Sequence, residues 1–322
     1  MISISVIIPT YKRSNLLKKC IKALLTQRFD KALYEIIVVS DGPDDETRRM
    51  LNDWTGYNFP LIRFFSLPQK KGPAAARNYG WLNAKGNIIA FTDDDCLPDA
   101  NWLKEIVTHC KPDEDIAVTG RVIVPVTKRP TDYELNTANL QEADFITANC
   151  ACTKRALHKA GGFDEKFCMA WREDSDLEFK LINNAIPIKR LPSAVVVHPV
   201  RHSAWGISVK EQKKTMYDAL LYKKHPHLFR KKIKPAHPVL YYLIIASCLA
   251  ALAGLVSGND MLRNTGLITW MALTIYFVCK RLAVTKLTAS HIIEMVVTSL
   301  IIPFASIFWR WYGAIKYRVL FI

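Results

Sequence analysis

The sequence predicts an α/β domain with a doubly wound, mostly parallel sheet, followed by C-terminal transmembrane helices. Two observations predict this architecture. Short β-branched runs alternate with helical stretches over the first hundred residues, and long uncharged segments follow residue 238. Strands that alternate with helices in this way build a parallel sheet covered by helices. An uncharged segment of about 20 residues is long enough to cross a bilayer.

The strands of the α/β domain are predicted from four runs that are apolar on both faces, as in a covered parallel sheet. These runs are residues 4–8, 35–39, 61–65 and 87–91. Between the first two, residues 14–27 carry apolar side chains at helical spacing after a capping candidate, Ser14. Strand, helix and strand therefore follow one another at the rhythm of a doubly wound fold.

The pattern is looser beyond residue 115. An apolar stretch at 116–124 is followed by a predicted loop at 125–143, a strand at 145–148 and a helix at 153–159. We expect this half of the domain to face a second substrate.

Three C-terminal segments are apolar enough to lie in a membrane. Residues 239–257 carry no charge over 19 positions, which as a helix spans about 28 Å, and residues 264–279 and 295–309 are further uncharged runs. We expect the first two to form a transmembrane hairpin. The third contains Pro303 and either crosses the membrane, lies in its plane or forms a re-entrant helix. A buried helical subdomain or an oligomer interface is the alternative for these segments.

Flanking charges predict the orientation of the hairpin, because loops rich in Lys and Arg stay in the cytoplasm. The connection between the two arms has only Arg263, whereas both outer flanks are basic: Arg230, Lys231, Lys232 and Lys234 before the hairpin, and Lys280, Arg281 and Lys286 after it. The domain before the hairpin is therefore expected on the cytoplasmic face of the membrane. The eight cysteines include no CxxC pair, which agrees with reduced thiols there.

The net charge of +15 is concentrated beside the apolar tail. Residues 1–200 have a net charge of +2 and residues 201–234 one of +8. Such a stretch is expected at an anionic lipid surface. Nucleic acid is not an expected partner, because no helix-turn-helix, zinc-finger or aromatic RNA-binding motif accompanies the charge. We predict an α/β domain at 1–200, basic juxtamembrane or interfacial helices at 201–237, and the membrane segments at 238–322; an oligomer is compatible with this division.

Three polar clusters follow the predicted strands, at residues 9–11, 40–42 and 92–95. In doubly wound sheets, ligands bind beyond the carboxyl ends of the strands. The last cluster holds Asp93, Asp94 and Asp95, whose adjacent carboxylates repel one another unless a cation or ligand offsets their charge. A divalent metal, Mn²⁺ or Mg²⁺, with a bound diphosphate would do so. A solvated acidic turn is the alternative.

Six motifs extend this pattern along the chain. They are Val6-Ile7-Ile8-Pro9-Thr10-Tyr11, Val39-Ser40-Asp41-Gly42, Ala76-Arg77-Asn78-Tyr79-Gly80, Asp93-Asp94-Asp95, Gly161-Gly162-Phe163-Asp164 and Glu173-Asp174-Ser175-Asp176-Leu177. In this order and spacing they resemble a family 2 glycosyltransferase with the glycosyltransferase A fold, which is Rossmann-like. The resemblance covers residues 1–200, and only the combination of motifs is specific. It implies that residues 1–200 are a catalytic domain that binds a nucleotide sugar.

The resemblance implies a donor site. Pro9, Thr10, Tyr11 and Asp41 match positions that hold the nucleotide base, and Arg77 matches one that assists. For Asp41 the alternative is a turn former before a glycine.

In the family's DxD motif, the first carboxylate lies on the ribose side and the last coordinates the metal. These positions are Asp93 and Asp95 here, and Asp94 is assigned to the nucleotide sugar with a less defined role. His198 follows an apolar run and resembles a late family histidine that reaches the metal or the diphosphate. A strand-end histidine held by hydrogen bonds is the alternative.

The resemblance also implies an acceptor site. Asp174 matches the general base of the family's acidic motif, with Glu173 as the fallback, and a hydroxyl needs such a carboxylate to take its proton. The alternative places both acids at an exposed helix N-terminus, where the helix dipole favours them. Trp171 and Arg172, beside the flexible Gly161-Gly162 pair, are candidates for binding the acceptor sugar.

The implied activity is an inverting, metal-dependent transfer from a nucleoside diphosphate sugar to an acceptor hydroxyl. We expect the acceptor to be a saccharide, linked to a lipid, in cell-envelope polysaccharide synthesis. Two alternatives stay open: transfer to polyprenyl phosphate, and a non-catalytic, membrane-tethered protein that binds nucleotide sugars. A processive synthase is disfavoured because the sequence lacks a QxxRW motif, and a nucleotidyltransferase because no glycine-rich motif follows the first strand.

Overall fold

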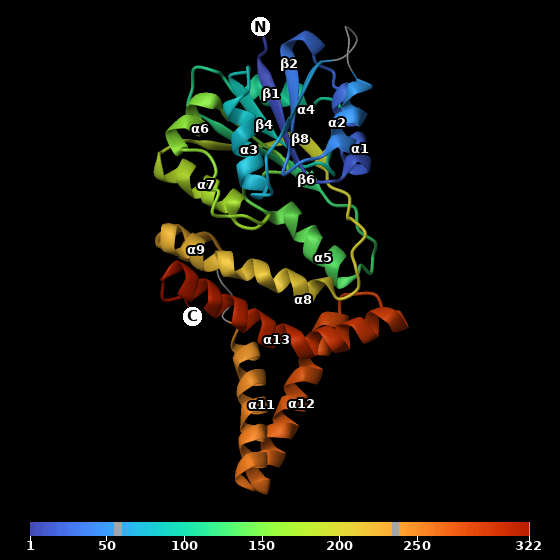
Figure 1. Ribbon diagram of the computed structural model, residues 1–322, viewed down its shortest axis with the longest axis vertical. Helices are drawn as coiled ribbons and strands as arrows, with labels where there is room; N and C mark the ends of the chain where they lie inside the picture. The colour runs from blue at the N-terminus through green and yellow to red at the C-terminus, as the bar shows by residue number, and fades with distance from the viewer. Residues whose placement is uncertain (55–59, 234–237, 322) are drawn as a thin grey trace. The chain divides into compact units, whose positions relative to one another are not determined.

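The computed structural model describes residues 1–54, 60–233 and 238–321 (Figure 1). The chain forms two compact units. Unit 1 comprises Met1–Pro125 and Ala138–Val200, and unit 2 comprises Val126–Thr137 and Arg201–Ile322. Lys234, one of the basic residues expected before the hairpin, lies outside the described residues.

Unit 1 is built on a sheet of eight strands among the described residues, in the order β3-β2-β1-β4-β7-β6-β8-β5. The strands are β1 (Ile4–Thr10), β2 (Tyr34–Ser40), β3 (Leu61–Ser66), β4 (Ile88–Phe91), β5 (Leu97–Pro98), β6 (Ala117–Ile123), β7 (Cys150–Thr153) and β8 (Ile188–Val197). Strands β3, β2, β1 and β4 are parallel. Strand β7 is antiparallel to β4 and β6, and β6 and β8 are again parallel. The predicted doubly wound α/β sheet is confirmed as a mixed sheet with a parallel half.

Helices cover both faces of this sheet because side chains alternate along each buried strand. Ile4, Val6 and Ile8 of β1 belong to one apolar cluster, which also contains side chains of α1 and α4. Ile7 faces the other way, into a cluster with side chains of α3, α6 and α7. The helices of unit 1 are α1 (Ser14–Leu25), α2 (Asp45–Asn52), α3 (Pro73–Leu82), α4 (Trp102–His109), α6 (Lys154–Ala160) and α7 (Glu173–Asn183), with short 3-10 turns at Lys31–Leu33 and Asn139–Glu142.

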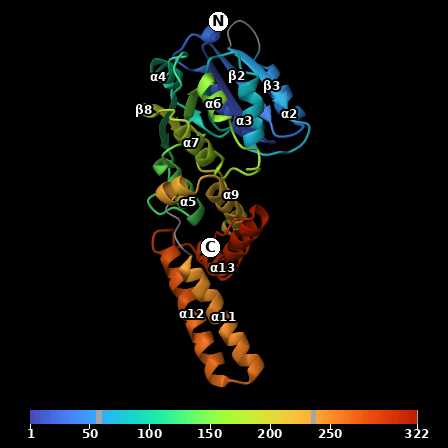
Figure 2. The same cartoon turned by 90° about the vertical axis from the view of Figure 1, so that its left-hand side faces the viewer.

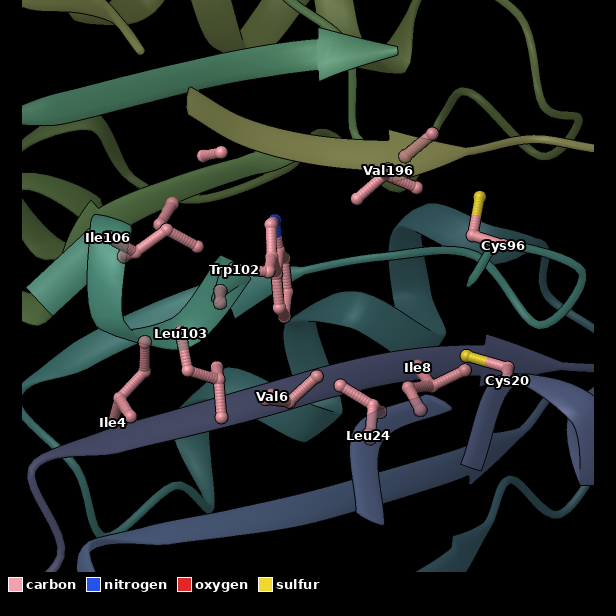
Figure 3. Close-up of a cluster of buried hydrophobic side chains, with 14 of the residues drawn as sticks. Ile4, Val6, Ile8, Cys20, Leu24, Cys96, Trp102, Leu103, Ile106 and Val196 are labelled. Carbon is pink, nitrogen blue, oxygen red and sulfur yellow. The ribbon is translucent and has the colours of Figure 1, made fainter. Parts of the chain in front are cut away.

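Trp102 lies at the centre of the first cluster. Figure 3 shows its indole among Val6 of β1, Leu103 of α4 and Val196 of β8. The indole is fully buried, and its Nε1 donates a hydrogen bond of 2.8 Å to Oδ1 of Asn149. The Asn149 amide in turn donates to the backbone carbonyl of Ala194. Through Asn149, which directly precedes β7, the indole of α4 is therefore connected to β8. No buried donor of the indole is left unsatisfied.

The structure differs from the sequence prediction between residues 125 and 153. The expected loop at 125–143 contains α5 (Asp132–Ala138), and the strand expected at 145–148 lies instead at Cys150–Thr153. Helix α5 begins with a capping box, in which Thr131 and Glu134 each accept the other's backbone N–H. The helix has only 7 residues and buries none of them, so it has no apolar stripe that a periodicity argument could detect. Its start is defined by the capping bonds instead.

Unit 2 is helical. Besides α5 it contains α8 (Ile207–Glu211), a 3-10 turn (η3, Gln212–Thr215), α9 (Met216–Lys224), α10 (Pro226–Leu228), a π-helical turn (η4, Phe229–Ile233), α11 (Val239–Ser257), α12 (Asp260–Leu282) and α13 (Ala289–Tyr317). Helices α11 and α12 lie side by side (Figures 1 and 2). They approach closely at Gly266, where an added Cβ would lie 2.5 Å from the backbone nitrogen of Ala251. The expected antiparallel pair of C-terminal apolar helices is present.

Two described helices, α11 and α13, are long and apolar enough to cross a membrane by length and composition alone. Helix α12 does not meet this condition. Arg263 near its beginning and Lys280 and Arg281 near its end leave a shorter apolar stretch between them.

Trp102→Ala should lower the free energy of unfolding by about 3–5 kcal/mol, because it opens a cavity in the core and leaves the Asn149 carbonyl oxygen without its donor. Denaturant titration of the detergent-solubilised protein measures this loss. Leu82→Ala on α3 is the control, since the Leu82 side chain is exposed and its truncation should change stability by about 0.5 kcal/mol or less. A similar loss in both variants would show that Trp102 is not the centre of the core.

Candidate functional site

The candidate site lies at the carboxyl ends of β1, β2 and β4, which are parallel neighbours. Each strand ends in one of the polar clusters that the sequence analysis identified. Strand β1 ends at Thr10, β2 at Ser40, and β4 just before Thr92. The parallel register therefore brings the three clusters to one edge of the sheet, as expected for a doubly wound fold.

Asp94 fixes the acidic turn after β4. Its carboxylate accepts a hydrogen bond of 2.8 Å from the Thr10 hydroxyl, and Arg13 lies 3.4 Å from its other oxygen. Thr10 and Asp94 are both buried. Asp94 thus binds the turn to the end of β1, and this contact gives a structural role to the residue whose function the sequence left least defined.

Asp93 and Asp95 lie in a compact group with Cys96 and His198. One potential ligand atom from each of these four residues lies within 4.8 Å of the others. His198 reaches the group because β5 pairs with the end of β8, where Leu97 is opposite Val197. The His198 Nε2 atom is 3.6 Å from Oδ1 of Asp95. Two residues more than 100 positions apart are thereby neighbours, as the prediction for this histidine required.

The donor set fits a divalent cation. Carboxylate oxygens and an imidazole nitrogen suit Mn²⁺ and Mg²⁺, and two to three protein ligands leave room for phosphate oxygens. His198 is buried, and its Nδ1 has no hydrogen-bond partner among the described residues. Cys96 is the member that sequence reasoning missed, although it directly follows the acidic triplet. Burial, and then the charges of Asp93 and Asp95, raises the pKa of its thiol well above the usual value, so the sulfur stays protonated and is a poor ligand for a hard cation.

Arg77 connects this group to the acidic motif on α7. From its position on α3, its guanidinium donates a hydrogen bond of 2.7 Å to Asp93 and another of 3.0 Å to Glu173. All three groups belong to unit 1, and Arg77 and Glu173 are almost completely buried. A guanidinium suits this task, because its separate nitrogens can each donate to a different carboxylate at once. Arg77 is therefore a bridge between two motifs.

Glu173 and Asp174 form the first turn of α7, whose N-terminal dipole favours negative charge. The alternative placed both acids at an exposed helix N-terminus. They do lie at the helix N-terminus, but Glu173 is buried and Asp174 is half-buried. Burial, and then the neighbouring Asp174 charge, raises the pKa of Glu173 to about 7, although Arg77 opposes this. Burial also raises the pKa of Asp174, against the opposing hydrogen bond of 2.7 Å from the Ser175 N–H. Both pKa values are shifted in the direction that makes a carboxylate a stronger proton acceptor.

The loop before α7 is held against α3 by close backbone contact. Gly72 has φ 101°, and a Cβ there would lie 2.4 Å from the Cys168 carbonyl oxygen. Asn78 of α3 both donates to and accepts from the backbone of Phe163, at 3.0 Å each. These contacts fix where α7 begins, and so fix the acidic pair relative to Arg77.

The residues expected to hold the base lie at the ends of β1 and β2. Pro9 is buried within β1, and the half-buried Tyr11 ring lies over Gly42, with the Lys70 ammonium 4.2 Å from its centroid. The Asp41 carboxylate accepts the backbone N–H groups of Lys71 and Gly72, at 2.7 and 2.9 Å. Asp41 thus fixes the segment that leads into α3, whereas the alternative made it a local turn former before Gly42.

Trp171 and Arg172 stand directly before the acidic pair. Both side chains are partly exposed, and the Arg172 guanidinium carbon lies 4.8 Å from the centroid of the Trp171 ring. Arg172 has φ 71°, an unfavourable left-handed conformation for a residue with a Cβ. One face of the indole is therefore occupied by a cation, and an acceptor sugar at this ring stays a prediction.

Comparison with known proteins matches residues 5–164 to the family described as Glycosyl transferase family 2. Two curated relatives are "Glycosyltransferase AglE" of Haloferax volcanii, 35% identical over 33% of this chain and 34% of that protein, and "Chondroitin synthase" of Escherichia coli, 24% identical over 72% of this chain and 40% of that protein. The chain thus spans well under half the length of these two relatives. The crystal structure of S. aureus TarS 1-349 in complex with UDP has a TM-score of 0.50 at 15% identity, covering 84% of this chain and 90% of that one, and this likeness shows the fold.

Arg77→Lys should lower kcat/KM by roughly 10- to 100-fold, because the single ammonium nitrogen of lysine replaces the two guanidinium nitrogens that reach Asp93 and Glu173 separately, and a charged hydrogen bond is worth about 1.5–3 kcal/mol. Sugar-transfer assays across a donor series measure the effect. Arg155→Lys is the matched control, since Arg155 forms an exposed ion pair with Asp115 on the same unit. Full activity in Arg77→Lys would refute the bridging role.

Proposed function

From the premise that this chain carries a glycosyltransferase domain of family 2, we propose that it performs an inverting transfer of a sugar from a nucleoside diphosphate sugar to an acceptor hydroxyl. One observation carries the proposal. Arg77 joins Asp93 of the acidic triplet to Glu173 of the acidic pair, so the groups expected at the donor and at the acceptor belong to one hydrogen-bonded chain. An in-line transfer needs both reactants held in such fixed geometry.

The donor is proposed to bind across the ends of β1, β2 and β4. A family 2 domain and the UDP complex of TarS, a protein of similar fold, support a nucleoside diphosphate. Tyr11 and Lys70 offer an aromatic ring and a cation beside Gly42, where a base and a phosphate can approach the backbone. Pro9, Thr10 and Asp41 shape this site from the strand ends.

A divalent cation, Mn²⁺ or Mg²⁺, is proposed to bind Asp95 and His198, with Asp93 beside them. When bound, such an ion offsets the negative charge that develops on the departing diphosphate. Asp93 is placed on the ribose side, because Arg77 already binds one of its oxygens. Asp94 holds the turn through Thr10.

Asp174 is proposed as the general base. Glu173 is bound to Arg77, whereas the Asp174 carboxylate is half-buried and accepts hydrogen bonds from its neighbour Ser175. Asp174 takes the proton of the acceptor hydroxyl while the oxygen attacks the anomeric carbon from the face opposite the diphosphate. The transfer inverts that carbon and needs no covalent enzyme intermediate. Trp171 and Arg172 are proposed to contact the acceptor.

The acceptor is proposed to be a saccharide, carried by a lipid, for cell-envelope polysaccharide. The C-terminal apolar helices support a membrane location, and the basic residues on both flanks of the α11–α12 pair support a cytoplasmic catalytic domain. In this arrangement residues 1–200 form the catalytic domain, 201–237 the interfacial helices and 238–322 the membrane part. A polyprenyl phosphate acceptor is the second candidate, because its oxygen is already ionised and needs no base.

Asp95→Asn should abolish metal-dependent binding of the donor, because it removes a charged ligand from the cluster, and turnover should fall on the order of 100-fold or more. Binding of uridine, thymidine and guanosine diphosphate sugars, with and without Mn²⁺, measures this and identifies the base. Glu142→Gln, an exposed acid on the same unit, is the control. Donor binding by Asp95→Asn that still depends on Mn²⁺ and reaches the wild-type level would exclude the metal role of Asp95. Donor binding without transfer to any acceptor would instead favour the non-catalytic alternative.

The pH dependence of transfer should show an acid limb above the range of an ordinary aspartate, because burial raises the pKa of the proposed base, Asp174. The base must be deprotonated to act, and the raised pKa values of Glu173 and Asp174 mean that activity is present above this limb and lost as the pH falls through it. Glu173→Gln removes the neighbouring negative charge and should move the limb to lower pH. Initial rates at saturating donor, measured between pH 5 and 9 as a range about this limb, report the shift.

Asp174→Asn should reduce kcat by about 10²- to 10⁴-fold for a hydroxyl acceptor. Asp53→Asn, an exposed aspartate at the end of α2, is the matched control. A near-normal rate in Asp174→Asn would support the polyprenyl phosphate acceptor instead.

A further inference from the structure

Helix α13 has two faces of different chemistry. The face buried within unit 2 carries mostly small or polar side chains: His291, Met295, Thr298, Ser299, Ile302, Ser306, Arg310 and Gly313. The opposite face is exposed and carries large apolar side chains: Ile293, Val296, Leu300, Ile301, Phe304, Phe308, Trp311, Tyr312 and Ile315. This distribution is the reverse of that of a helix on the surface of a soluble protein, which buries its apolar side.

The buried face of α13 packs on the basic segment that contains α8, η3 and α9. Near its beginning, Glu294 accepts a hydrogen bond of 2.8 Å from the Gly206 N–H. Further along, Gly313 lies so close to Met216 that an added Cβ would be 2.4 Å from the Met216 carbonyl oxygen. At the end, the Lys223 ammonium donates to the Tyr317 carbonyl at 2.7 Å. These contacts extend along most of the 29 residues of α13.

The packed segment cannot lie in the hydrocarbon core. Residues 201–224 contain six Lys or Arg and two acidic residues. Each charge at the centre of a bilayer costs about 2.5–3.5 kcal/mol even on the most lenient scale. Because α8, η3 and α9 follow α13 along its length, a crossing of α13 would carry Lys210, Lys213 and Lys214 into the membrane. The composition of α13 alone permits a crossing, but its packing does not.

We infer that α13 lies in the plane of the membrane interface, with its exposed apolar face in the acyl-chain boundary and its polar face on the basic layer of α8, η3 and α9. The inference rests on the membrane attachment in the proposed function. The exposed face continues into the hairpin, since Trp311 Nε1 donates a hydrogen bond of 3.2 Å to the hydroxyl of Tyr242 on α11. Ile302 also packs in a small cluster with Ile244 and Phe277, where α11, α12 and α13 meet.

A lipid surface is the occupant that the charges favour. Lys316 and Arg318 are exposed at the end of α13, and the packed layer adds the lysines of α8 and η3. An apolar helix face with lysines at its end and a basic layer packed behind it matches an interface with anionic headgroups. The α11–α12 pair leaves from the middle of this surface, so the two parts contact the same bilayer.

Membrane topology tests the inference in the full-length protein. Single cysteines at Ser290 and Lys316, at the two exposed ends of α13, are introduced after Cys168→Ser and Cys279→Ser remove the exposed native thiols. A membrane-impermeant maleimide is then applied to sealed vesicles of both orientations. Both ends should label from the same side. The reference for that side is native Cys168, labelled in the Cys279→Ser protein. Cys168 and the basic layer are expected on one side, because no candidate membrane span lies between Cys168 and residue 224 in the described chain.

Met261, exposed in the first turn of α12 next to the connection with α11, supplies the control for the opposite side when replaced by cysteine. Labelling of Ser290→Cys and Lys316→Cys from opposite sides would overturn the inference and make α13 a spanning helix. Release of the whole protein by alkaline carbonate would instead refute the membrane attachment itself, so the two failures are distinguishable.

Depth of burial separates lipid from a second copy of the chain. A bimane label at Phe308→Cys should be quenched severalfold more by lipids brominated in the upper acyl chain than a label at Lys210→Cys on the basic layer. Equal, weak quenching at both positions, with disulfide cross-linking between two Phe308→Cys chains, would show that another copy covers this face and would overturn the inference.

Discussion

The catalytic unit depends on one buried guanidinium. Six carboxylates, those of Asp93, Asp94, Asp95, Glu173, Asp174 and Asp176, belong to the two acidic motifs of unit 1, and most of them are removed from water. Burying like charges is unfavourable unless a cation is placed among them. Arg77 supplies that cation from α3 and binds one carboxylate of each motif. Burial raises the pKa of Glu173 to about 7 although Arg77 opposes this, which agrees with only partial compensation of the negative charge.

The position of Arg77 is in turn set by how α3 begins. Asp41 at the end of β2 accepts the N–H groups of Lys71 and Gly72, so the helix starts from a fixed point on the sheet. Gly72 then allows the loop before α7 to approach the backbone, and Asn78 binds that loop again one turn later. The loop before α7 is thereby held by the rigid helix α3. Loops that present functional side chains are commonly positioned by rigid elements in this way.

Much of this arrangement was predictable from sequence because it follows from strand order. The apolar runs located β1 to β4 within a few residues, and the carboxyl-end rule brought the acidic triplet to the correct edge. Contacts across the chain were not predictable. Neither spacing nor periodicity shows that Asp94 binds Thr10, or that the pairing of β5 with β8 adds Cys96 and His198 to one cluster. Cys96 is fully buried, and nothing in the sequence distinguished it from the other cysteines.

Two misplaced elements have the same explanation. Residues 145–148 are apolar and buried, yet the strand forms at Cys150–Thr153, where small side chains pair with both β4 and β6. Helix α5 is too short for a periodic signal, and its capping box decides where it begins. In both cases tertiary pairing or local capping determined the structure where intrinsic patterning was weak.

The membrane part shows why mean hydropathy is an incomplete guide. A hydropathy window averages over all faces of a helix, so α13 and α11 appear equivalent. Helix α11 is apolar around its whole circumference, whereas α13 buries Thr298, Ser299 and Arg310 on one side. Arg281 of α12 adds to this polar side, since it donates to Thr298, Ser299 and Asp132. A helix whose polar side is bound by charged neighbours is held at the depth where those charges stay hydrated, and the packing of a helix therefore limits its position in a bilayer more strongly than its composition does.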